Sequence, residues 1–338
     1  MEERSENNMQ DAFRLSVAPM IDWTDRHCRA FHRLISGEAW LYTEMIVAQA
    51  IIHGDRARLL GRQGDGDRVV LQLGGADPEE LAQAVRLATP WGYAEVNLNV
   101  GCPSDRVQSG CFGAVLMRDP PLVARCLAAM REAAAPGVDV TVKCRIGVDE
   151  QEPEAVLPGF VEAVAATGVT RIIIHARKAW LQGLSPRENR EIPPLDHDLV
   201  HRMKARFPHL AIEINGGIAS AEQARAHLAR GLDGVMIGRA AYHQPFDILG
   251  GWDAYPPFAD PLGVAEAMRP TIAAHLAAGG RLHQITRHML GLFHARPGAR
   301  LWKRLLSEAG PAGDLTTYDA ALHAVEGAMT AAEQRAAG

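Results

Sequence analysis

The sequence predicts an α/β protein built as a (β/α)8 TIM barrel and followed by a C-terminal all-α helical domain. Short apolar, β-branched runs recur eight times between residues 15 and 237, and most are followed by a stretch with helical periodicity. A doubly wound sheet is the alternative. It would place a Gly-x-Gly-x-x-Gly turn after the first strand, and the sequence has none there.

The expected strands cover residues 15–19, 41–45, 69–73, 94–99, 140–146, 171–176, 211–215 and 234–237. The expected helices between them include 78–87, 121–133, 154–166, 198–207 and 221–230. We therefore assign residues 12–255 to the barrel and expect the polar residues 1–11 to be disordered. A proline-rich linker follows, and residues 262–338, with helices at 299–308 and 318–336, form the expected helical domain.

The composition is that of an ordinary globular protein, with 47% hydrophobic and 22% charged residues. Five cysteines without a Cys-x-x-Cys pair predict reduced thiols and a cytoplasmic setting. No apolar run approaches the roughly 20 residues that cross a membrane, and the polar N-terminus does not resemble a signal peptide. No His, Cys and Asp spacing suggests a metal site, and no obligatory protein partner is evident.

Charge is distributed unevenly along the chain. The formal net charge is −5, yet residues 281–304 contain six Lys or Arg and no Asp or Glu. An apolar stripe of Leu282, Ile285, Met289 and Leu292 runs through this window, and we expect Arg287 and His288 to lie off it. A solvated helix face is the plainer explanation, but the absence of acids favours a phosphate-binding surface.

The segment 95–104 carries the clearest chemical signal. It predicts a buried strand that places the amides of Asn97 and Asn99 on one face, because side chains alternate along a strand. A Gly-Cys-Pro-Ser turn then presents the thiol of Cys102 at the strand's carboxyl end, where ligands bind in parallel α/β proteins. Two amides and a thiol can hold an amide-rich ring and give it a proton. The alternative is that Cys102 is a small buried apolar residue.

Other expected strands also end in polar side chains, namely Gln72, Lys143, His175 and Asn215. Buried lysines are rarely free of a partner or a function, so this coincidence at one end of the barrel predicts a site. Cys144 lies on the opposite face from Lys143, and we attach no role to it.

Glycines follow the last two expected strands, at Gly216-Gly217 and Gly238, and Arg239 comes next. Such turns commonly bind a phosphate in barrels, and an arginine can complete the clamp. A phosphate there, with Lys143 to stabilise a reduced anionic ring, suits flavin mononucleotide, FMN. Without a Rossmann fingerprint, a nicotinamide donor would visit the flavin without a domain of its own.

Several segments in order along almost the whole chain resemble the tRNA-dihydrouridine synthases. They are 18–28, 42–45, 71–75, 97–117, 142–147, 175–177, 190–194 and 215–218. The blocks 22–28 and 189–195 resemble the A-type bacterial subfamily. The resemblance implies a flavin barrel with a helical tRNA-binding domain, in which NADPH reduces FMN, the flavin N5 gives hydride to uracil C6 and Cys102 protonates C5. It also implies that the reduced uridines are positions 20 and 20a of the tRNA D-loop.

Carried over by motif, the resemblance assigns FMN contacts to Ala18, Pro19, Met20, Gln72, Lys143, His175, Asn215, Gly216, Gly217, Gly238 and Arg239. It assigns the target uracil to Asn99 and Arg190, and further tRNA contacts to Arg187, Arg300 and Lys303. The leading alternative is an FMN barrel reductase of the dihydroorotate or enoate type, acting on a free small molecule. An aldolase with Lys143 as a Schiff-base lysine and a catalytically silent RNA-binding protein are further alternatives.

Overall fold

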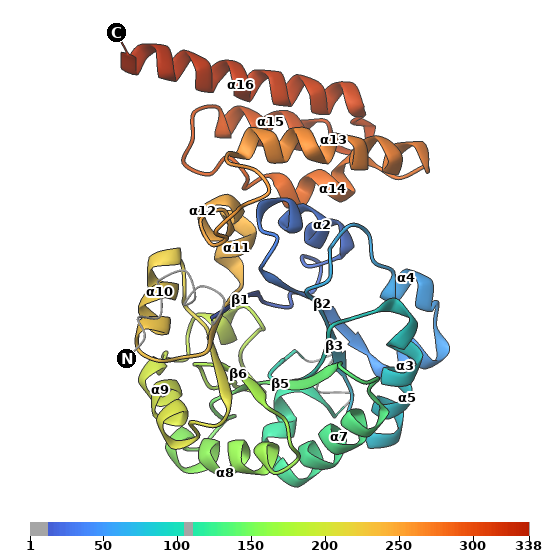
Figure 1. The fold of residues 1–338 in the computed structure, drawn as a ribbon, viewed down its shortest axis with the longest axis vertical. Helices are drawn as coiled ribbons and strands as arrows, with labels where there is room; N and C mark the ends of the chain where they lie inside the picture. Colours follow the sequence, from blue (N-terminus) through green and yellow to red (C-terminus); the bar gives the residue numbers. More distant parts are fainter. Residues whose placement is uncertain (1–12, 105–110, 338) are drawn as a thin grey trace, which may run out of the picture.

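The computed structural model describes residues 13–104 and 111–337, so the expectation for residues 1–11 lies outside the described part. Eight parallel strands close into a barrel in the order β1 to β8, as the sequence predicts (Figure 1). The strands are β1 Arg14–Val17, β2 Trp40–Val47, β3 Val69–Gly74, β4 Glu95–Val100, β5 Asp139–Arg145, β6 Arg171–His175, β7 Ala211–Asn215 and β8 Gly234–Ile237. The ends of these strands differ from the predicted ones by at most two residues.

Helices surround this barrel (Figure 1). They are α2 Arg26–Ile35, α3 Ala48–His53, α4 Arg56–Leu60, α5 Pro78–Ala88, α7 Pro120–Ala133, α8 Pro153–Ala165, α9 His197–Arg206 and α10 Ala221–Ala229. Asp77 and Asp119 cap α5 and α7 by accepting backbone N–H bonds, and a proline follows each cap. Because a cap satisfies otherwise unpaired N–H groups and proline presets helical φ, these residues fix where the helices begin.

The floor of the barrel holds buried charges. Arg14 bonds Glu95 at 2.7 Å and Glu213 at 3.1 Å, and both carboxylates are at most 1% exposed. Arg171, on the neighbouring strand β6, forms a second ion pair with Glu213 at 2.9 Å. The paired charges and their hydrogen bonds offset the cost of removing these groups from water.

After β8 the chain is helical. The elements are α11 Arg239–His243, α12 Pro245–Leu249, α13 Pro261–Ala277, α14 Leu282–Met289, α15 Ala299–Glu308 and α16 Leu315–Ala337. The aromatic rings of Phe293, Trp302 and Tyr318 stack edge to face in the interior of this region, with all three side chains fully buried. Figure 1 shows α13 to α16 stacked beside α2, on one flank of the barrel.

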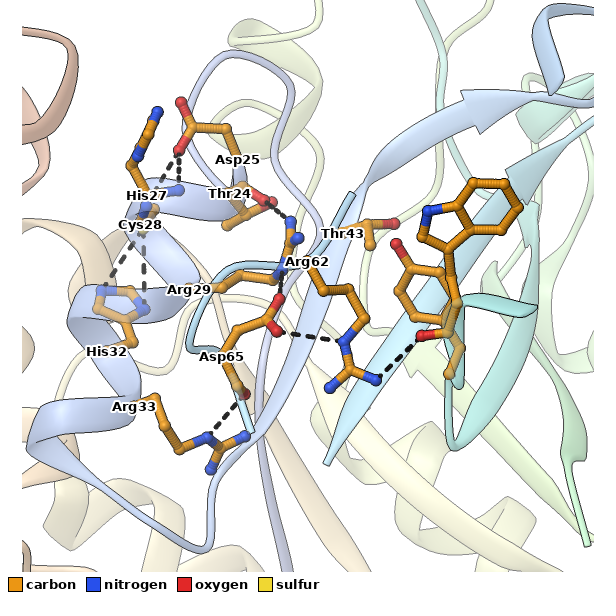
Figure 2. Close-up of polar contacts among 12 residues, drawn as sticks. Thr24, Asp25, His27, Cys28, Arg29, His32, Arg33, Thr43, Arg62 and Asp65 are labelled. Carbon is orange, nitrogen blue, oxygen red and sulfur yellow. Dashed lines mark hydrogen bonds and ion pairs between the residues drawn. The ribbon is translucent and has the colours of Figure 1, made fainter. Parts of the chain in front are cut away.

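The helix α2 is anchored to the loop that precedes β3. Arg29 on α2 donates to Asp65 Oδ2 at 2.9 Å, and Arg62 donates to Asp65 Oδ1 at 3.1 Å (Figure 2). All five cysteines are free thiols. Within the described residues, no helix has the length and apolar character that a membrane crossing requires.

Candidate active site

The strand register gathers the predicted polar residues into neighbouring pairs. Gln72 lies opposite Asn97, and Asn99 lies opposite Lys143. His175 lies opposite Asn215 on β7. Because the strands are parallel, these pairs meet at the carboxyl end of the barrel, where the sequence predicts the site.

A column of hydrogen bonds runs up the barrel interior to this end. Thr141 Oγ1 donates to Glu95 at 2.6 Å and accepts from Asn97 Nδ2 at 2.8 Å. Asn97 Oδ1 in turn accepts from Gln72 Nε2 at 2.9 Å. Gln72 Oε1 then accepts from Asn99 Nδ2 at 2.8 Å. Each carboxamide therefore has a fixed orientation, and each retains a second N–H that could donate a hydrogen bond to a ligand.

The Cys102 turn sits at the top of this column. Asn99 Oδ1 accepts the backbone N–H of Gly101 at 3.1 Å and that of Cys102 at 2.9 Å. The Cys102 carbonyl accepts from the N–H of Ala114 at 2.9 Å. The thiol itself is half-buried and lies 3.4 Å from the Ser104 hydroxyl. Asn99 thus orients the turn as well as facing the barrel mouth.

Two further titratable groups lie on the neighbouring strands, Lys143 on β5 and His175 on β6. Burial, with Arg145 beside it, lowers the pKa of Lys143 to about 8. No described residue forms a hydrogen bond or ion pair with its ammonium. Burial, with Arg145 and Lys143 nearby, holds the pKa of His175 well below its usual value, so the imidazole is neutral. Cys144 points into the outer core, where burial raises its pKa to about 12.

The glycine turns form a cradle around His175. Gly216 and Gly217 have φ of +110° and +75°, which favours glycine. A Cβ on Gly216 would lie 3.1 Å from the His175 ring. At Gly238 a Cβ would lie 3.6 Å from both Ala18 and Met20, so the residues that follow β1 and β8 adjoin each other.

Two buried polar atoms at this cradle have no hydrogen-bond partner among the described residues, His175 Nδ1 and Arg177 Nε. Such atoms are costly unless a ligand or water satisfies them. A glycine cradle, unpaired N–H and ring nitrogen atoms and a lysine without a counter-ion fit a phosphorylated planar ring such as a flavin.

Two of the predicted arginines at the mouth, Arg187 and Arg239, converge on a single carboxylate, Glu191. Arg239 Nη1 pairs with Glu191 at 2.7 Å, and Arg187 Nε lies 3.5 Å from the same oxygen. Arg239 also approaches the Arg190 carbonyl at 3.4 Å. Arg190 itself is exposed and ends the 3-10 turn η3 Glu188–Arg190. The side chains of this cluster are exposed and can exchange partners when an anion binds.

Arg145 is a site residue to which sequence reasoning gave no role. Its guanidinium is buried and donates to the carbonyls of Gly101 at 3.0 Å, Lys178 at 2.9 Å and Asn189 at 2.9 Å. It therefore ties the Cys102 turn to the loop that carries Arg190. The only signal in the sequence is its position on the same strand face as Lys143.

Arg300 and Lys303 do not join the barrel mouth but lie exposed on α15. The window 281–304 around them presents less free positive charge than its composition indicates, because acidic residues from other segments pair with two of its arginines. Arg287 pairs with Asp25, and Arg296 pairs with Asp247. Arg287 lies off the apolar stripe and is exposed, as expected, but the same expectation for His288 is wrong, because its side chain is fully buried against Asp25 and Tyr242.

Comparison with known proteins places this geometry in a family. The family model described as "Dihydrouridine synthase (Dus)" matches residues 16–326. The tRNA-dihydrouridine(20/20a) synthase of Xanthomonas campestris is 54% identical over 301 residues, which cover 88% of this chain and 89% of that protein. The enzyme of the same name from Salmonella typhimurium is 52% identical over 333 residues, covering 96% and 99%.

Among solved structures, morphinone reductase shares the fold, with a TM-score of 0.50 and 14% identity over 69% of this chain and 84% of that one. The family match covers both the barrel and most of the helical region, including the Cys102 turn and the glycine cradle. This chain belongs to the dihydrouridine synthase family.

Proposed function

We propose that this protein reduces the C5–C6 double bond of uridines 20 and 20a in the D-loop of tRNA to dihydrouridine, with FMN as cofactor and NADPH as reductant. The observation that carries the proposal is 52–54% identity, over about nine tenths or more of the chain, to proteins named tRNA-dihydrouridine(20/20a) synthase. The activity belongs where tRNA is processed, in the cytoplasm.

The residues that would hold the flavin come from β1, β3 and β5 to β8. The Gly216-Gly217 and Gly238 turns, with Arg239, would bind its phosphate through backbone N–H groups and a guanidinium. Lys143 would lie along the ring with Gln72, Asn215 and the 18–20 backbone. His175, whose Nδ1 has no partner among the described residues, would donate to or accept from the bound group. When bound and reduced, the flavin supplies the hydride for C6.

The chain's own residues then orient the base and supply the proton. The uridine must leave its stack to enter the barrel mouth, at a cost of a few kcal/mol that is smallest in a loop. The free N–H of Asn99 and the guanidinium of Arg190 would bind the uracil carbonyls. Cys102, whose backbone N–H bonds Asn99 at 2.9 Å, would donate its thiol proton to C5.

We further propose that residues 262–338 form the tRNA-binding domain. Arg300 and Lys303 lie exposed on α15, where no described acidic residue forms an ion pair with them, so they are free to contact phosphates. Arg187, 80% exposed beside the mouth, would contact the tRNA closer to the flipped base.

The direct test is to incubate unmodified tRNA with the protein and NADPH and to map dihydrouridine by mass spectrometry. We expect product at positions 20 and 20a. Product elsewhere in the D-loop would keep the reaction and refute the assigned positions. A flavin-containing protein that oxidises NADPH and leaves tRNA unmodified would favour the small-molecule reductase.

A further inference from the structure

A buried polar contact joins the barrel to α14. It consists of three side chains, which we call the Asp25 junction: Asp25, Tyr242 and His288. Asp25 Oδ1 caps α2 by accepting the backbone N–H groups of His27 and Cys28 at 2.9 and 3.0 Å (Figure 2). Its other oxygen, Oδ2, lies 3.1 Å from His288 Nε2. One carboxylate therefore fixes both the start of a barrel helix and a helix of the C-terminal region.

The opposite side of His288 meets a second barrel segment. Tyr242 on α11 places its hydroxyl 3.1 Å from His288 Nδ1. The tyrosine ring stacks on Trp23, with centroids 4.4 Å apart and planes inclined by 21°. His288 is fully buried, so its ring nitrogens depend on protein partners, which are Tyr242 at Nδ1 and Asp25 together with the Nε of Arg287, 3.1 Å away, at Nε2.

Each barrel partner lies next to a segment that we assign to the flavin. The N–H groups of Trp23 and Thr24 both donate to the Met20 carbonyl at 3.0 Å, and Thr24 Oγ1 accepts from the Met20 N–H at 3.0 Å. Asp25 follows this closed turn directly. On the other side, α11 carries Tyr242 and begins at Arg239. The junction therefore adjoins the flavin site on two sides, and its side chains need not contact the flavin themselves.

The Asp25 carboxylate carries the negative charge of the junction. Burial raises the pKa of Asp25, but the hydrogen bonds and charges of His288, the Cys28 N–H and Arg287 outweigh it and hold that pKa well below its usual value. Arg287 adds a 2.7 Å ion pair to the same oxygen. The carboxylate thus stays ionised and holds two side chains of α14.

We propose that the Asp25 junction positions the C-terminal helices against the flavin site, so that a tRNA bound on α15 presents its uridine to Cys102 in reacting geometry. This inference rests on the proposed function. Asp25, Tyr242 and His288 are positioning residues, since they act through the 20–24 turn and α11. No part of the junction is needed for the electrostatic attraction of tRNA.

Misplacement of a reacting group by about 1 Å can cost about 100-fold in rate, whereas tRNA affinity depends mainly on phosphate contacts elsewhere. Asp25→Asn keeps the helix cap, because Asn caps as well as Asp, but removes the charge. Tyr242→Phe keeps the stack on Trp23 and removes the hydroxyl. We expect each to slow dihydrouridine formation in a single turnover about tenfold or more.

The experiment compares flavin content, NADPH oxidation, tRNA dissociation constant and single-turnover rate in these two variants. The first three should stay within about twofold of wild type, since their determinants are untouched. His288→Leu should show the same selective loss of rate. His288→Gln, which restores a donor near the Nε2 position, should recover part of the rate.

The matched control is Arg269→Gln, which breaks a bidentate ion pair with Asp319 at 2.7 and 2.8 Å between α13 and α16, two helices of the C-terminal region. It should leave all four measurements unchanged. Unchanged rates in Asp25→Asn and Tyr242→Phe would overturn the inference, as would an equal loss in the control. If the wild type itself forms no dihydrouridine, the proposed function fails and the inference fails with it.

Discussion

Replacing Arg14 with Met at the barrel floor should lower the free energy of unfolding by about 3–5 kcal/mol, the usual cost of removing one partner from a buried ion pair. The guanidinium pairs with Glu95 at 2.7 Å and Glu213 at 3.1 Å, and these carboxylates are 1% and 0% exposed. Glu213 keeps Arg171 at 2.9 Å, which favours the lower end of this range. Since domains are typically stable by about 5–15 kcal/mol, the loss would be easy to detect.

Urea unfolding followed by circular dichroism measures this loss. The matched control is Arg202→Met, because Arg202 pairs with Glu154 at 2.7 Å but both side chains are about half exposed or more. The control should cost at most about 0.5–1 kcal/mol. Adding Glu95→Gln to Arg14→Met should recover stability, because Arg14 is the only ion-pair partner of Glu95 among the described residues and the second change removes the carboxylate left uncompensated. A loss below about 1 kcal/mol in Arg14→Met, equal to the control, would refute the reasoning.

The remaining predictions concern the reaction. Cys102→Ala should leave flavin content and NADPH oxidation intact and abolish dihydrouridine formation, and an equal yield by mass spectrometry would exclude the thiol as proton donor. Gly216→Ala should lower flavin content several-fold by absorbance, because φ is +110° and the new Cβ lies 3.1 Å from a histidine ring; full flavin content would contradict this. The pKa of Lys143 is lowered to about 8, so the ammonium is charged below that pH and neutral above it. Flavin affinity of the apoprotein, titrated by fluorescence, should therefore fall as pH rises through about 8, and Lys143→Met should flatten this dependence. The double variant Arg300→Ala, Lys303→Ala should weaken tRNA binding and reduce the slope of log K against log salt by about 1–2; an unchanged slope would remove these residues from the interface.

The sequence was sufficient for the barrel and for the end at which its polar residues gather. Strand alternation placed Asn97 and Asn99 on one face, and both bond Gln72 in the structure. The same alternation turned Cys144 away from the site, into the outer core. These inferences succeed because they depend on local periodicity, which a short strand enforces.

What the sequence could not supply depends on distant partners. Arg287 belongs to a run of basic residues, and only the fold shows that Asp25, 262 positions away, neutralises it. Arg145 donates to three backbone carbonyls on separate segments, and because every residue has a backbone carbonyl, the sequence cannot indicate these partners. The helix α13 was not predicted as an element, because Pro270 interrupts its pattern, although the helix continues through it.

The hydrogen-bond column above the floor has a direction, and Glu95 determines it. An ionised carboxylate can only accept, so the Thr141 hydroxyl must donate to it and must accept from Asn97 Nδ2. Each amide above is then committed in the same sense, until the oxygen of Asn99 faces the N–H of Cys102. A flipped amide anywhere would set two donors or two acceptors against each other. A negative charge at the bottom of the barrel therefore dictates the direction of the amide dipoles up to the Cys102 turn, several residues away from it.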